Sequence, residues 1–135
     1  MSIIHWTPEQ FGTHVNATDD EHKTIFTMLN QLNDTIVAGD AGGARAQLDA
    51  LIGFVAGHFK TEEDLMTAHH YPGFAAHKAA HDKLVETALA LQAQVHCGEV
   101  KLSTDHTAFV RDWLVGHIPH TDKPYGPYLN ERGVH

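Results

Sequence analysis

The sequence is poor in the residues that mark secreted, membrane-spanning or nucleic-acid-binding proteins. It has one cysteine, Cys97, which excludes an internal disulfide framework and an all-cysteine zinc site. Its 9 lysines and arginines form no cluster and face 17 acidic residues, a formal net charge of −8, so we expect no nucleic-acid partner. No apolar run approaches the roughly 20 residues that span a bilayer, and no basic segment followed by an apolar stretch opens the chain. We therefore expect no membrane insertion and a cytoplasmic location.

The chain has the length and composition of one folded domain, with 135 residues of which 42% are hydrophobic. Apolar residues recur at three- and four-residue steps in four stretches, which predicts helices at 19–38, 44–68, 73–95 and 103–118. Thr18 or Asp19 is the expected N-cap of the first helix. Residues 1–18 form an N-terminal arm and 119–135 a C-terminal tail. Four amphipathic helices with short connections predict an all-α, antiparallel up-down-up-down four-helix bundle.

Histidine is the residue in excess: the chain has 13, and several lie among the apolar positions of the predicted helices. His58 and Glu62 are four residues apart on the second helix, and His77 and His81 are four apart on the third. Residues four apart lie one turn above each other, so the two side chains of each pair reach one point. Each pair therefore resembles half of a metal site.

The first and fourth predicted helices add three more polar side chains. His22 lies on the apolar stripe of the first helix, and His117 near the end of the fourth. Asp122 follows His117 by five residues, which on a regular helix turns it about 140° away. Asp122 can join His117 only if the helix loosens or ends, and Pro119 supplies a break at this point.

These side chains together predict a metal site, although each one alone is more typical of a hydrogen-bonded or water-facing residue. A buried polar group without a partner costs about 1–3 kcal/mol, and so many on four helices require a common partner. They exceed the ligands of one octahedral ion, so we expect two ions. If the two acids and a solvent-derived oxygen all bridge, one coordination position stays open for a small ligand. The predicted ligands are His22, His58, Glu62, His77, His81, His117 and Asp122.

The pattern resembles the hemerythrin family, in particular its single-domain bacterial type, over nearly the whole chain. The matching motifs are DDEH at 19–22, HFKTEEDLM at 58–66 and WLVGHI at 113–118, followed by Asp122 and Tyr125. The chain departs from the usual family pattern at four positions where Ile, Gln, Gly and Phe are common, and none is a predicted ligand. These positions are Thr18, Glu21, His70 and Leu84.

The resemblance implies two non-haem iron ions, bridged by Glu62, Asp122 and an oxo or hydroxo group, that bind dioxygen reversibly. Three imidazoles would complete one ion: His77, His81 and His117. The other ion would keep an open position beside His22 and His58. Four apolar residues within four positions of a ligand are expected to form a dry wall around that position, which would disfavour loss of reduced oxygen. They are Ile25, Phe59, Trp113 and Ile118.

The leading functional hypothesis is an O2 carrier that transports or stores O2 or delivers it to an O2-consuming enzyme; we expect a monomer and no enzymatic activity. Oxygen-activating di-iron bundles use four Glu and two His, whereas this site has two acids and five imidazoles, which favours binding over O–O cleavage. The alternatives are an O2 or redox sensor and a di-iron peroxidase or nitric-oxide-handling enzyme. Metal storage or zinc binding is a further alternative, since the same ligands would tolerate zinc.

Overall fold

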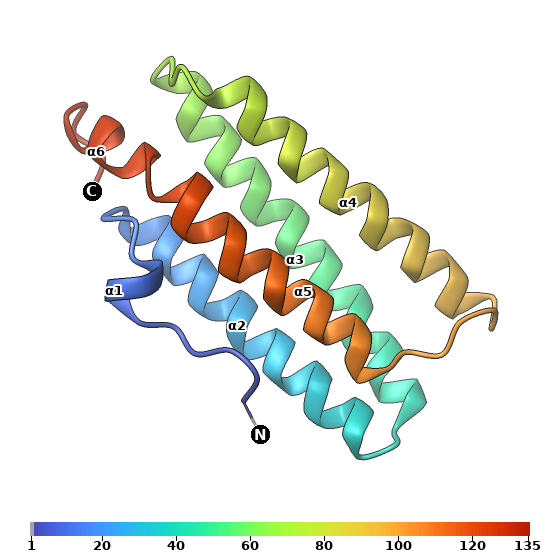
Figure 1. The fold of residues 1–135 in the computed structure, drawn as a ribbon. Coiled ribbons are helices and arrows are strands. Elements are labelled where there is room, and N and C mark those ends of the chain that lie inside the picture. The colour runs from blue at the N-terminus through green and yellow to red at the C-terminus, as the bar shows by residue number, and fades with distance from the viewer. Residues whose placement is uncertain (1) are drawn as a thin grey trace.

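The computed structural model describes residues 2–135, and all regular structure in that range is helical. Four long helices run antiparallel, with α2 packed against α3 and α5, and α3 against α4 (Figure 1). The predicted four-helix bundle is confirmed. The elements in chain order are α1 (Pro8–Phe11), α2 (Asn16–Val37), α3 (Ala41–Ala68), α4 (Phe74–His96), α5 (Thr104–His117), the π-helix η1 (Ile118–Asp122) and α6 (Tyr125–Asn130).

The start of α2 differs from the prediction, because it begins at Asn16 rather than residue 19. Thr18 and Asp19 are therefore not N-caps. The Thr18 hydroxyl donates to the Val15 carbonyl within the first turn, and the Asp19 carboxylate accepts from the backbone N–H and the hydroxyl of Thr13. Both side chains thus tie the preceding loop to the helix. The helix therefore gains nearly one turn at its start, which the apolar periodicity does not predict.

The next helix also begins earlier than predicted, at Ala41 instead of residue 44. Asp40 is its N-cap, and its carboxylate accepts the backbone N–H of Gly43 at 3.0 Å. Asp40 therefore starts the helix within the glycine-rich connection, since an aspartate cap satisfies one of the unpaired N–H groups of the first turn.

Residues 119–135, predicted as a C-terminal tail, contain most of η1 and all of α6. α6 folds back over one end of the bundle (Figure 1), where Tyr125 and Leu129 join Val15 and Met66 in a small apolar cluster. The Tyr128 hydroxyl donates to the His69 carbonyl at 2.7 Å. Both tyrosines therefore pack back onto the bundle.

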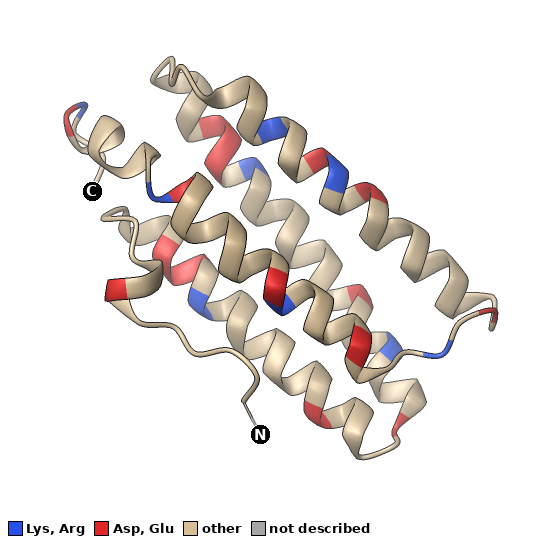
Figure 2. Ribbon diagram, viewed as in Figure 1, with Lys and Arg blue, Asp and Glu red and all other residues tan. Residues whose placement is uncertain are grey.

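The main apolar core lies between the long helices, with side chains such as Leu29, Leu32, Leu48 and Leu51 buried. Charged residues lie mainly on the outward faces, where Asp and Glu outnumber Lys and Arg (Figure 2). None of the helices within 2–135 is long and apolar enough to cross a membrane.

Candidate metal centre

The predicted ligands gather at one end of the bundle because its helices run antiparallel. They lie early in α2 and α4 and late in α3 and α5, and these segments are neighbours at the end that η1 and α6 cover (Figure 1). All seven are buried, with exposed fractions from 0% for Glu62 to 7% for His117. Burying so many polar groups is unfavourable unless they pair or bind an ion.

The seven side chains form two overlapping groups, and within each group the potential ligand atoms lie within 4.8 Å of one another. Glu62 and Asp122 belong to both groups. The larger group adds His77, His81 and His117, and the smaller one adds His22 and His58. Two positions that share two carboxylates are the arrangement expected of a bridged metal pair.

Asp122 faces the two groups with different oxygen atoms. Its Oδ1 lies 2.8 Å from His77 Nε2 and 3.0 Å from His117 Nε2, both in the larger group. Its Oδ2 lies 3.0 Å from His22 Nε2 in the smaller group. A carboxylate placed in this way can bind one ion with each oxygen.

Glu62, on α3, also lies between the two groups. Its Oε1 is 3.1 Å from His81 Nε2 and 3.4 Å from His58 Nε2, and its Oε2 is 3.6 Å from His22 Nε2. The Tyr125 hydroxyl donates to Oε2 at 2.6 Å. This bond fixes the carboxylate, because a phenol held in the core has few alternative positions.

The free atoms of the cluster fit a metal site. The Nε2 atoms of His22, His77, His81 and His117 have no hydrogen-bond partner among the described residues, nor do Glu62 Oε1 and both oxygens of Asp122. Buried polar atoms are normally paired, so converging nitrogen and oxygen atoms without hydrogen-bond partners point to a cation. Imidazole nitrogen and carboxylate oxygen together suit iron or zinc.

The π-helix η1 brings Asp122 into the cluster. It follows α5 directly and ends at Asp122, and Pro119 lies in its first turn. A π-helix has more residues per turn than an α-helix, so a residue five positions after His117 returns to nearly the same face. The helix therefore loosens where the spacing of His117 and Asp122 requires it.

Two further carboxylates, which the sequence patterns did not single out for this role, hold the outer nitrogens of two imidazoles. Glu21 Oε1 lies 2.7 Å from His58 Nδ1, and Glu63 Oε2 lies 2.9 Å from His81 Nδ1. Such bonds keep the proton on Nδ1 and direct the Nε2 lone pair inward. Their place in the sequence could have indicated this role: Glu21 directly precedes His22, and Glu63 directly follows Glu62. A residue next to a ligand on a helix can face the neighbouring helix.

The comparisons with known proteins agree with this geometry. A family model described as the hemerythrin HHE cation binding domain matches residues 13–129. A bacteriohemerythrin of Methylococcus capsulatus is 52% identical, with 96% of this chain and 99% of the relative covered, and a hemerythrin-like protein of Naegleria gruberi is 33% identical over 92% of both chains. The chain belongs to the hemerythrin family. A crystal structure of wild-type hemerythrin superposes with a TM-score of 0.93 at 52% identity, over 95% of this chain and 98% of that one.

The carboxylates and imidazoles of the cluster shift one another's pKa values when no metal is bound. Burial lowers the pKa of His22, but Asp122 and Glu62 outweigh it and raise it to about 10; the same causes raise that of His77 to about 9. Burial and the Glu62 charge raise the pKa of Asp122, yet the imidazoles bring it to about 2. The pKa of His58 is lowered, chiefly by burial. Without metal, the cluster therefore holds carboxylates beside the protonated imidazoles of His22 and His77.

The predicted oxygen-pocket residues lie in two places. The Phe59 ring stacks on His81 at 3.8 Å between centroids, and the Trp113 ring stacks on His117 at 4.1 Å. Both rings thus cover imidazoles of the larger group. Ile25 and Ile118, 1% and 0% exposed, belong to the main apolar core instead. The lining of an open position by these residues stays a prediction.

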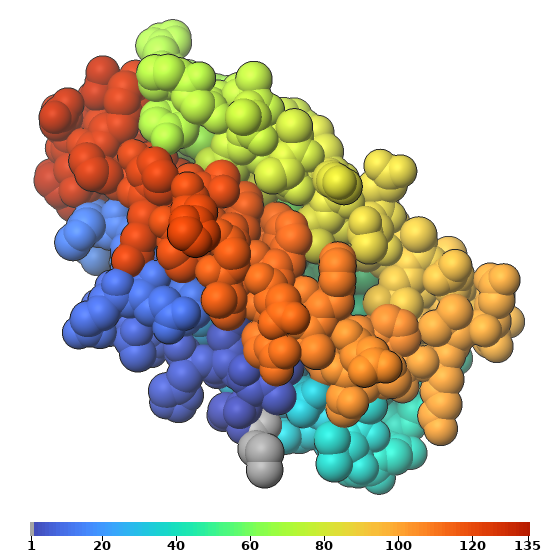
Figure 3. Space-filling model, viewed as in Figure 1, coloured from blue at the N-terminus to red at the C-terminus, as the bar shows by residue number. Residues whose placement is uncertain are grey.

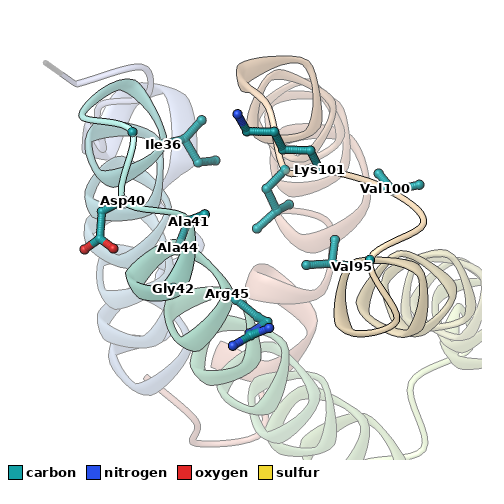
Figure 4. Close-up of a pocket in the computed structure, with 12 residues that line it drawn as sticks. Ile36, Asp40, Ala41, Gly42, Ala44, Arg45, Val95, Val100 and Lys101 are labelled. Atoms are coloured by element: carbon teal, nitrogen blue, oxygen red, sulfur yellow. The ribbon is translucent and has the colours of Figure 1, made fainter.

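Two cavities lie away from the predicted ligands. One of about 610 Å³ lies between α3, α4 and α5 and is largely apolar, and α3 is visible between the other two helices in Figure 3. The other, of about 310 Å³, lies at the far end of the bundle beside the connections from α2 to α3 and from α4 to α5. Its two basic side chains, Arg45 and Lys101, point in different directions (Figure 4).

Proposed function

We propose that the chain binds dioxygen reversibly at a pair of non-haem iron ions and serves in O2 transport, storage or delivery. The observation that carries the proposal is the pair of overlapping ligand groups that share Glu62 and Asp122. When bound, two ferrous ions would supply two electrons and one open coordination position, which is the chemistry that reversible O2 binding needs.

The unequal size of the two groups supports a single open position. Three imidazoles and two carboxylates would complete one ion together with a bridging oxygen. The other ion would have the same two carboxylates and bridging oxygen but only two imidazoles, those of His22 and His58, so it would lack one ligand. The two carboxylates are fewer than in oxygen-activating di-iron bundles, which favours a carrier over an enzyme.

The experiment is repeated oxygenation of the reduced, iron-loaded protein. O2 is admitted under a spectrophotometer, then removed with argon, without any reductant. We expect the deoxy spectrum to disappear and return over many cycles. Oxidation in a single pass would contradict a carrier. Unchanged spectra in the presence of O2 would contradict dioxygen binding altogether.

Monomeric state, a cytoplasmic location and an O2-consuming recipient enzyme stay predictions. The dispersed surface charge supports a monomer (Figure 2), and the large exposed hydrophobic residues are few: Val37, Leu89, Phe109 and Val115. Sedimentation of the iron-loaded protein at several concentrations tests the monomer, because an oligomer would show a mass above the 14.9 kDa of one chain.

A further inference from the structure

The cavity of about 610 Å³ between α3, α4 and α5 has a largely apolar lining. α4 packs against α3 and α5 against α2, so α4 and α5 stay apart along this stretch and the cavity opens between them (Figure 3). Buried leucines line its inner side, namely Leu48, Leu51 and Leu84. Phe109 also lines it and is 51% exposed, so its ring lies on the side that solvent reaches. A cavity of this volume can hold a small organic molecule.

The polar side chains of this lining disfavour an acidic ligand. None of the described residues that line the cavity is Lys or Arg, and Glu86 is an acid. Glu86, Thr87 and Gln94 are exposed to water, which leaves His106 as the polar lining residue that is partly buried. A carboxylate would therefore lose its hydration without gaining a cation, whereas a neutral apolar molecule gains free energy by leaving water.

His106 offers the cavity a hydrogen-bond donor that is held in place by the start of α5. Ser103 is the N-cap of α5, and its backbone N–H donates to His106 Nδ1 at 3.0 Å in a capping box. Because Nδ1 accepts, the proton of the neutral imidazole lies on Nε2. Both hydrogen bonds of the ring involve Nδ1, so Nε2 has no partner within residues 2–135. Its N–H is therefore available to a ligand.

We propose that this cavity binds a neutral apolar molecule that carries a carbonyl group, whose oxygen accepts a hydrogen bond from His106 Nε2. A carbonyl only accepts, whereas a hydroxyl or amide would bring a donor that the apolar part of the lining leaves unpaired. A planar ring in the ligand would pack against Phe109. The proposal goes beyond dioxygen binding and does not rest on it, since no predicted metal ligand lines the cavity.

The test compares three ligands of similar shape by isothermal titration calorimetry on the iron-loaded full chain. The ketone is 2-acetylnaphthalene, and the alkene is 2-isopropenylnaphthalene, in which a methylene group replaces the carbonyl oxygen. The third ligand, 2-naphthoate, is an anion. We expect both neutral ligands to bind and 2-naphthoate to bind most weakly. Absence of binding by the neutral ligands, or tightest binding by 2-naphthoate, would overturn the proposal.

Two variants of His106 test the hydrogen bond itself. Glutamine and glutamate at this position both close a capping box with serine, so α5 keeps its N-terminus, but only glutamine has an N–H to donate. The measured value is the ratio of the affinity for the ketone to that for the alkene, in which changes common to both ligands cancel. We expect His106→Glu to lower this ratio about tenfold, because the carbonyl is then buried without a donor, and His106→Gln to keep it near the wild-type value. An unchanged ratio in His106→Glu would overturn the role of His106.

Ala88→Phe tests the place of binding. Ala88 lines the cavity from α4, and a phenyl group there would occupy the space of the ligand, so we expect both neutral ligands to lose binding. Ala93→Phe is the matched control, because Ala93 is exposed on α4 and outside the lining. Wild-type binding by Ala88→Phe would overturn the cavity as the site and leave the O2 proposal standing. Failure of the oxygenation cycles would overturn the O2 proposal and leave these affinities unaffected.

Discussion

The imidazole nitrogen that faces inward decides what each histidine of the cluster can do. All five histidines direct Nε2 toward Glu62 or Asp122. Only two have a carboxylate on the outer nitrogen: Glu21 for His58 in the smaller group and Glu63 for His81 in the larger. Each group thus contains one imidazole whose orientation is fixed by a carboxylate, which also makes its Nε2 a stronger metal ligand.

Glu21→Gln should weaken metal binding at the smaller group. Glutamine keeps a hydrogen-bond acceptor but loses the charge that strengthens the bond to His58, so we expect about tenfold faster loss of the more weakly held ion to a chelator. Glu99→Gln, at an exposed acid in a turn, is the control. Equal release of metal from both variants and the wild type would show that Glu21 has no such effect.

Asp122→Ala should abolish the paired site, because Asp122 contacts imidazoles of both groups with separate oxygens. We expect loss of paired iron and a fall of about 3 kcal/mol or more in the free energy of unfolding under iron-loaded conditions. Metal analysis and denaturant unfolding give the two values. Asp49→Ala is the control, since that acid pairs with His96 on the surface. Retention of both ions by Asp122→Ala would contradict a bridging role.

At the scale of the elements, η1 is the segment that makes the site complete. Pro119 has no backbone N–H and interrupts the α-helical ladder that would otherwise continue from α5. A regular α-helix through residues 118–122 would turn Asp122 away from His117. The local backbone and the metal site are therefore coupled through Pro119, which is not itself a predicted ligand.

Pro119→Ala should make the regular helix easier to form and metal binding weaker. A proline inside a helix costs about 3 kcal/mol, so up to about 10²-fold in metal affinity can be lost while the metal-free fold is as stable or more stable. Competition with a chelator and thermal unfolding measure the two effects. Pro127→Ala in α6 is the control. Unchanged affinity would mean that the packing of α6 alone holds Asp122.

Gly126→Ala should separate α6 from the loop before α2. Its new Cβ would collide with the Thr13 carbonyl oxygen, which belongs to the backbone and cannot move cheaply, so we expect destabilisation by about 1–3 kcal/mol. Gly57→Ala is the matched control in α3, where nothing lies within 4 Å of a Cβ, and it should stabilise by about 0.5–1 kcal/mol. Denaturant unfolding should show a lower free energy of unfolding for Gly126→Ala and a higher one for Gly57→Ala.

The sequence predicts the four long helices because each carries an apolar stripe of its own. It also predicts that the helix loosens or ends at Pro119, where η1 lies. It does not predict α6, since the side chains of α6 become buried only against other elements, as Tyr125 does against Glu62. The predicted ligands are visible because they interrupt the apolar stripe at one-turn spacing. Glu21 and Glu63 are not, because an acid beside a ligand resembles a solvated surface residue until the facing helix is placed.

The whole molecule combines an acidic surface with a buried cluster that exchanges protons for metal. At neutral pH the raised pKa values of His22 and His77, about 10 and 9, keep both imidazoles protonated in the metal-free fold. Metal ions bind the neutral imidazole, so both protons must leave on loading. Metal affinity should therefore rise steeply with pH.

The stability of the metal-free form should fall as pH rises above 7, whereas that of the metal-loaded form should not. A histidine whose pKa is raised by folding stabilises the fold fully below its unfolded value of about 6.5, and this stabilisation is lost as pH rises through the folded value. The metal-free protein should thus lose stability between pH 7 and about 10, where His77 and then His22 give up their protons. The loaded protein should not, because its imidazoles carry no proton on Nε2. Denaturant unfolding of both forms across this range measures the difference, and equal pH profiles would contradict the coupling of imidazole protons to metal binding.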